Sequence, residues 1–164
     1  MAAAVDFILS GGASNTDPQL SRGGAKSATP VNSSADQNLF ANVGSTEAEV
    51  GSEKYRCIYI EAPVGKTFTN LGVWISTPTP SNSSRIAIGL APEGLNGEAE
   101  LIPDEVTAPA DVVFTRPVAD YQRLSLPDLN PGDYIALWIK RTISVQAQGF
   151  DNDYARLTVE GVEV

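Results

Sequence analysis

The chain has 164 residues, of which 42% are apolar and 19% charged, and its formal net charge is −9. This length fits one domain with a sizeable core, and the acidic balance argues against a general binder of nucleic acids or anionic membranes, which needs a surplus of lysine and arginine. The chain has no histidine and one cysteine, Cys57, which excludes Ser-His-Asp and Cys-His catalysis, histidine-ligated metals and an internal disulfide.

The beginning of the sequence lacks the features of a membrane or export signal. No apolar run approaches the roughly 20 residues that span a bilayer. The longest early run, residues 2–9, is interrupted by Asp6 and has no basic residue before it. We therefore expect a soluble chain that is not exported by a secretory signal.

Residues 1–37 are predicted to form an extended N-terminal arm. Residues 5–9 (VDFIL) are strand-like, whereas residues 11–37 contain only two bulky apolar side chains, Leu20 and Val31. Because such a segment cannot bury enough surface to offset its ordering entropy, we expect the arm to be mobile in the isolated chain. It either docks on a neighbouring subunit as an added strand or is a disordered terminus. In the first case the assembly contacts are Val5, Phe7, Ile8 and Leu9.

From residue 38 onward, short runs of alternating apolar and polar residues predict β-strands. The expected strands are residues 55–60, 67–75, 85–90, 112–114, 121–126, 134–142 and 155–160. The run 134–142 is apolar on both faces, which favours a central strand, and the run 121–126 is expected at an edge. We expect one core between two sheets, containing Val73, Trp74, Ile88, Ile135, Leu137 and Trp138.

Turn residues separate these runs. Prolines occupy positions 78 and 80, Asn96-Gly97 is typical of a hairpin turn, and Asn130-Pro131-Gly132-Asp133 is typical of a four-residue turn. One or two helical turns are predicted within residues 45–53, with Ser45 as the N-cap. The sequence thus predicts an all-β fold: a body over residues 38–164 that is an antiparallel β-sandwich or jelly roll of seven or eight strands.

Three motifs could carry chemistry, and each has an ordinary structural alternative. Gly65-Lys66-Thr67 resembles the end of a phosphate-binding loop, but position 60 is isoleucine where that motif needs glycine. Asp151-Asn152-Asp153 could supply oxygen ligands to calcium, but it also fits an Asx-rich turn. Paired carboxylates could support glycosidase chemistry, although a solvated acidic loop is the simpler interpretation of Glu93, Glu98, Glu100, Asp104 and Glu105. We predict no catalytic, cofactor-binding or metal site.

The order and spacing of several motifs resemble a known family. These are YRCIYI at 55–60, LGVWI at 71–75 followed by TPTP at 77–80, IAIGL at 86–90, LNPGDYIALWIKRT at 129–142 and LTVEG at 157–161. Over about residues 38–161 the chain is similar to small virion structural proteins of tailed bacteriophages, of the capsid-decoration or head–tail accessory type. The resemblance implies a non-enzymatic β-sandwich and carries over no catalytic residue.

The resulting functional expectation is a capsid decoration or cement protein that binds the head lattice and links neighbouring subunits through its arm. The expected partners are the major capsid protein or other virion proteins and further copies of the chain, with no nucleic acid, membrane or cofactor. The protein would be made in the host cytoplasm and located on the capsid surface or in the head–tail region. A neck, collar or tail protein is the first alternative, and a carbohydrate- or receptor-binding β-sandwich, which should show exposed aromatic residues on loops, is the second.

Overall fold

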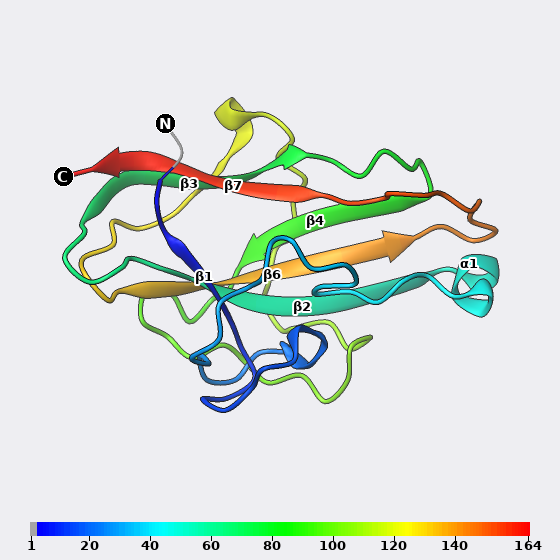
Figure 1. The fold of residues 1–164 in the computed structure, drawn as a ribbon, viewed down its shortest axis with the longest axis horizontal. Coiled ribbons are helices and arrows are strands. Elements are labelled where there is room, and N and C mark those ends of the chain that lie inside the picture. The colour runs from blue at the N-terminus through cyan, green and yellow to red at the C-terminus, as the bar shows by residue number, and fades with distance from the viewer. Residues whose placement is uncertain (1–2) are drawn as a thin grey trace.

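A computed structural model describes residues 3–164, which form two antiparallel β-sheets packed face to face (Figure 1). The four-stranded sheet has the order β1-β2-β6-β4, with β1 at Asp6–Leu9, β2 at Ser52–Glu61, β6 at Tyr134–Ile143 and β4 at Ser84–Leu90. The three-stranded sheet has the order β5-β3-β7, with β5 at Leu124–Ser125, β3 at Phe68–Thr77 and β7 at Arg156–Glu163. The predicted all-β sandwich is confirmed.

Within residues 3–164, helical structure is confined to three short segments. The α-helix α1 spans Ser45–Val50, and the 3₁₀-helices η1 and η2 span Pro18–Leu20 and Asp120–Gln122. The N-cap of α1 is Gly44 and no side chain caps this end, so the prediction that Ser45 is the cap is wrong. None of the described helices is long and apolar enough to cross a membrane.

Most of the predicted strands are present, and two differ. Residues 112–114 are not a strand, because they pass over the sheet edge and only Thr115 bridges to Ile88 of β4. In the run 121–126, η2 takes the first residues and leaves a two-residue strand, which does lie at a sheet edge as expected. The predicted turn at Pro131-Gly132 is confirmed, since the Asp133 amide donates to the Asn130 carbonyl over 2.9 Å and Gly132 has a φ of 82°.

The core is divided between the two faces of the four-stranded sheet. The face toward the three-stranded sheet forms the inter-sheet core, which includes Ile58, Val73, Ile88, Leu137 and Ile139. The opposite face carries a second buried cluster made of Tyr55, Cys57, Tyr59, Ala91, Ala99, Ile102, Ala136 and Trp138. As predicted, β6 is central and buried on both faces.

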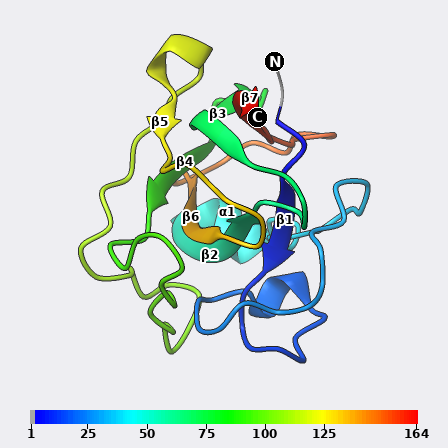
Figure 2. The ribbon, with the colours of Figure 1, turned by 90° about the vertical axis from the view of Figure 1, so that its left-hand side faces the viewer.

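The second cluster corrects the prediction of a single core. Trp138 is fully buried, but it belongs to the second cluster. Trp74 is only partly buried, because it alternates with the inward-facing Val73 and Ile75 and so lies on the outer face of its sheet. Residues 10–27 and 91–114, which we call the loop layer, cover the second cluster, and Figure 2 shows this layer below the two sheets.

The N-terminal segment is part of the sandwich and not a separate arm. β1 pairs with β2 in the register Asp6↔Glu61 to Leu9↔Ile58, and the Ala3 amide donates to the Val159 carbonyl of β7. Residues 3–9 therefore cross from one sheet to the other and close one side of the sandwich. Residues 115–125 close the other side, through the Ile75 amide to the Pro117 carbonyl and through β5 (Figure 2).

Candidate functional site

The predicted assembly contacts are all engaged within the chain. Val5 and Phe7 pack against the inter-sheet core and Ile8 packs against the second cluster. Leu9 is 1% exposed. The outer backbone edge of β1 is also paired, because residues 27–31 run beside it: the Leu9 amide donates to Thr29 over 2.9 Å and the Val31 amide donates to Phe7 over 2.7 Å. The prediction that residues 5–9 are free to dock on a neighbouring subunit is wrong, because their backbone and side chains are bound within the chain.

The three sequence motifs occupy ordinary loop positions. Gly65 and Lys66 lie in a tight turn between β2 and β3, where the Lys66 amide donates to the Pro63 carbonyl over 3.1 Å. Asp153 accepts a hydrogen bond from the Ser81 amide at 3.1 Å, which ties two loops together. No group of three or more His, Cys, Asp or Glu side chains that could hold a metal ion exists within residues 3–164.

Three of the five acidic residues of this region accept hydrogen bonds from other groups of the loop layer. Asp104 accepts three hydrogen bonds from the amides of Val106 and Thr107 and the Thr107 hydroxyl, and these hydrogen bonds, led by the hydroxyl, lower its pKa. Glu100 accepts from the Ala110 amide at 2.8 Å, and Glu93 accepts from the Glu100 amide at 3.2 Å. These carboxylates fix the loop layer locally.

Polar groups buried beneath the loop layer give it a defined shape. The Tyr59 hydroxyl donates to the Gly24 carbonyl at 2.6 Å and accepts from the Ala99 amide at 3.0 Å, so it joins both halves of the layer. Burial raises the pKa of Tyr59 to about 12. Gly23 lies so close to Glu100 that a Cβ would be 1.7 Å from its carbonyl oxygen. The layer is therefore pre-organised by the fold.

A buried ionic cluster lies where the four-stranded sheet reaches α1. The Arg141 guanidinium, 8% exposed, pairs with Glu47 of α1 at 2.9 Å, and Arg56, 2% exposed, pairs with Glu105 at 2.5 Å. The Phe40 ring contacts both guanidinium groups, at 4.9 Å from Arg141 and 5.1 Å from Arg56. Sequence reasoning missed this cluster, because its members come from segments far apart in the chain.

A cavity at the end of the sandwich near α1, which we call the α1-end pocket, has a volume of about 1090 Å³. Its floor is apolar and includes Ile58, Ile86, Ile139 and Ile143 of the four-stranded sheet. Residues 33–43 form one wall and residues 147–157 form the other. Here the inner face of the four-stranded sheet continues past the end of β7 at Arg156, so loops cover it instead of strands.

Both walls of this pocket are anchored. The Gln146 and Ala147 amides donate to the Glu49 and Ala48 carbonyls of α1. Arg141 donates to the Ala41 carbonyl at 2.7 Å. The pocket therefore exists before any ligand binds, as is usual for binding sites.

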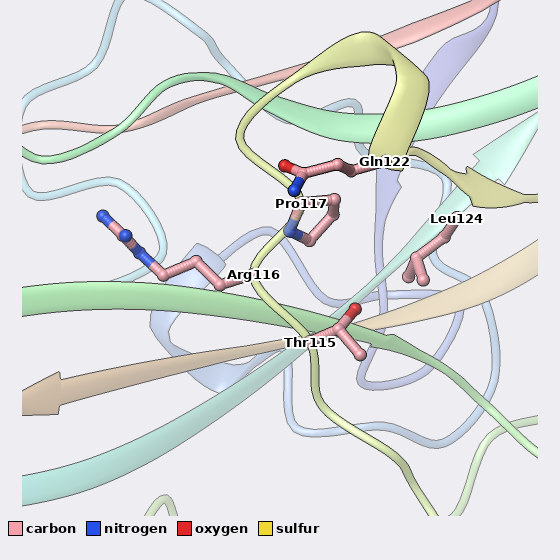
Figure 3. A pocket seen from close by; sticks show the side chains of 5 residues that line it. All are labelled: Thr115, Arg116, Pro117, Gln122 and Leu124. Atoms are coloured by element: carbon pink, nitrogen blue, oxygen red, sulfur yellow. The ribbon is translucent and has the colours of Figure 1, made fainter.

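A second, smaller cavity of about 250 Å³ lies on the segment that crosses from β4 to β5. In Figure 3 the Arg116 side chain extends away from Thr115 and Leu124. The Gln122 side-chain oxygen accepts the Val118 amide at 3.3 Å. The Arg116 and Gln122 side chains therefore do not converge on a common point in this cavity.

Sequence reasoning also missed the aromatic side chains of the α1-end pocket. Phe150 and Tyr154 line it and are 54% and 56% exposed. The signal was present in the sequence, since both flank the Asp151–Asp153 turn and lie outside any alternating run. Comparison with known protein families, curated proteins and solved structures finds no match for this chain.

Proposed function

We propose that the protein is a non-enzymatic structural component of a tailed-phage virion, a decoration or cement protein of the head. The order of motifs over about residues 38–161 supports this proposal. A second support is the composition of the loop layer. It carries five exposed large apolar side chains, which are 43–76% exposed: Leu20, Leu95, Leu101, Val106 and Val113.

The loop layer has the properties of a protein-contact surface. Exposed large apolar side chains are common components of sites that bind other proteins. The layer is fixed by the Tyr59 hydroxyl and by the Gly24–Ala99 bridge, so little ordering entropy is lost on association. The exposed carboxylates of Glu93, Glu98 and Asp104 favour a partner surface that offers basic as well as apolar groups.

In this proposal the loop layer replaces the N-terminal arm as the contact with the lattice. The run from Val5 to Leu9 is already paired with β2 and residues 27–31. Many copies on a repeating lattice multiply a weak contact through effective concentration. A neck, collar or tail location remains the alternative and differs in copy number.

Quantitative proteomics of purified virions tests the location. Hundreds of copies per particle are expected for a head decoration protein, whereas a ring in the neck or tail would hold about six to twelve. Absence from the particle would refute both proposals.

The contact surface is tested with the double variant Leu101→Ser and Val106→Ser, with Val64→Ser as the control. Val64 is 94% exposed but lies outside the loop layer. We expect the double variant to keep the thermal melt of the wild type and to lose most of its incorporation into particles, while the control is incorporated normally. Equal incorporation of both variants would show that the loop layer is not the contact.

A further inference from the structure

The α1-end pocket combines an apolar floor with a rim rich in short polar side chains. The rim hydroxyl, amide and carboxylate groups come from three loops. They belong to Ser33, Ser34, Asp36, Gln37, Asn38, Asn42, Thr79, Ser81, Ser83, Gln148, Asp151, Asn152 and Asp153. Such groups can donate and accept hydrogen bonds side by side, which suits a ligand that carries many hydroxyl groups.

Two aromatic side chains complete this rim. Phe150 and Tyr154 come from the same wall and remain about half exposed. An exposed ring on a loop offers a flat apolar face, and a tyrosine adds a polar tip. A sugar ring has an apolar face of C–H groups and a polar edge of hydroxyl groups, so it matches an aromatic face with hydrogen-bonding groups around it.

The charges of the pocket restrict the ligand further. Among the described residues that line the pocket, the basic side chains are Arg141 and Arg156, and none is lysine. Arg141 is buried against Glu47, so the exposed charges of the lining are one guanidinium, Arg156, and two carboxylates, Asp36 and Asp151. This balance disfavours phosphates, sulfates and uronic acids, and the polar rim disfavours a purely apolar ligand, which would leave those groups desolvated.

We propose that the α1-end pocket binds a neutral oligosaccharide, with Phe150 and Tyr154 stacking on sugar faces and the surrounding amides and carboxylates bonding to hydroxyl groups. The volume of about 1090 Å³ exceeds that of most small-molecule sites and leaves room for more than one sugar unit. The proposal concerns the isolated chain and does not depend on a location in a virion.

The first experiment applies the purified full chain to an array of neutral, uronic-acid-containing and sulfated oligosaccharides, with laurate binding measured separately. We expect binding to neutral oligosaccharides only. Binding confined to acidic glycans, binding of laurate without any glycan, or no binding at all would overturn the proposal.

The second experiment titrates the best-binding neutral oligosaccharide against Phe150→Ala, Tyr154→Ala and the control Tyr121→Ala. Tyr121 is 84% exposed in η2 and does not line the pocket. Loss of one stacking ring should weaken binding about fivefold or more, while the control binds like the wild type. All three residues are exposed, so the thermal melts should coincide. Equal affinity of the pocket variants and the control would refute the assignment to this pocket.

Discussion

Replacing Leu9 by alanine tests whether the N-terminal segment belongs to the folded body. The Leu9 side chain is 1% exposed, faces Ile58 across the β1–β2 pair, and lies on a strand paired on both edges. Truncating a leucine buried this completely costs about 2–5 kcal/mol, which is a large part of the stability of a small domain.

For a chain of this length, each kcal/mol lowers the melting temperature by about 2–4 °C, so Leu9→Ala should lower it by about 4–20 °C. The assay is a reversible thermal melt followed by circular dichroism, with urea unfolding to give the free energy directly. Val64→Ala is the matched control, because Val64 is 94% exposed and its truncation should change stability by less than about 0.5 kcal/mol.

Removal of residues 1–9 extends the same test. It deletes the whole of β1 and leaves the outer edge of β2 and the neighbouring core uncovered. We expect a chain that unfolds at or near room temperature or aggregates. If the truncated chain and Leu9→Ala both melt like the control, β1 contributes nothing to the body, and the interpretation of residues 1–37 as a separate arm would be restored.

Three other substitutions test the polar interior. Glu47→Gln should destabilise the protein by about 3 kcal/mol or more at pH 7, because Arg141 loses its buried counter-charge. Burial opposes ionisation of Glu47, but the Ser52 hydrogen bond and the charges of Arg141 and Lys54 outweigh it and lower the pKa. Its stabilisation is therefore complete above pH 4.5 and is lost as the pH falls through the lowered pKa, so the unfolding free energies of wild type and variant, measured by urea melts, should converge once the pH is below that pKa. A difference that does not shrink as the pH falls would contradict the ionic role. Tyr59→Phe should cost about 1–3 kcal/mol and speed hydrogen exchange of the Ala99 amide, which loses its acceptor; unchanged exchange would show that the hydroxyl does not join the loop layer. Gly23→Ala should lower the melting temperature, since a Cβ would be 1.7 Å from the Glu100 carbonyl oxygen, and a wild-type melt would mean that the loop layer can shift freely.

Most strands could be predicted from the sequence, because successive side chains of a β-strand point to opposite faces and so give an alternating apolar and polar pattern. The run 134–142 was apolar on both faces, and β6 is indeed central. The same alternation could have placed Trp138 opposite Leu137, but the sequence does not say that a loop layer covers the outer face. The prediction of one core failed for that reason.

The N-terminal error has a different physical origin. Residues 11–37 are poor in bulky apolar groups, and a segment of this composition is usually disordered. Here its order comes from backbone and hydroxyl hydrogen bonds to distant strands: the Tyr59 hydroxyl donates to the Gly24 carbonyl at 2.6 Å, and the Cys57 amide donates to the Ser21 carbonyl at 2.8 Å. Amino-acid composition gives no information about such long-range partners. For the same reason the α1-end pocket could not be predicted, since loops from distant parts of the chain form it together.

The position of β6 in the chain has a consequence for how the protein is made. β6 fills the middle of the four-stranded sheet but is the second-last strand, and both β2 and β4 pair with it. Until the ribosome has released the chain through Ile143, β2 and β4 lack their common neighbour. Pairings this distant slow folding, and unpaired apolar strands promote aggregation. The nascent chain therefore carries the apolar run Cys57–Ile60 without its β6 partner while residues 61–143 are synthesised, so chaperone supply and translation rate should govern the yield of folded protein.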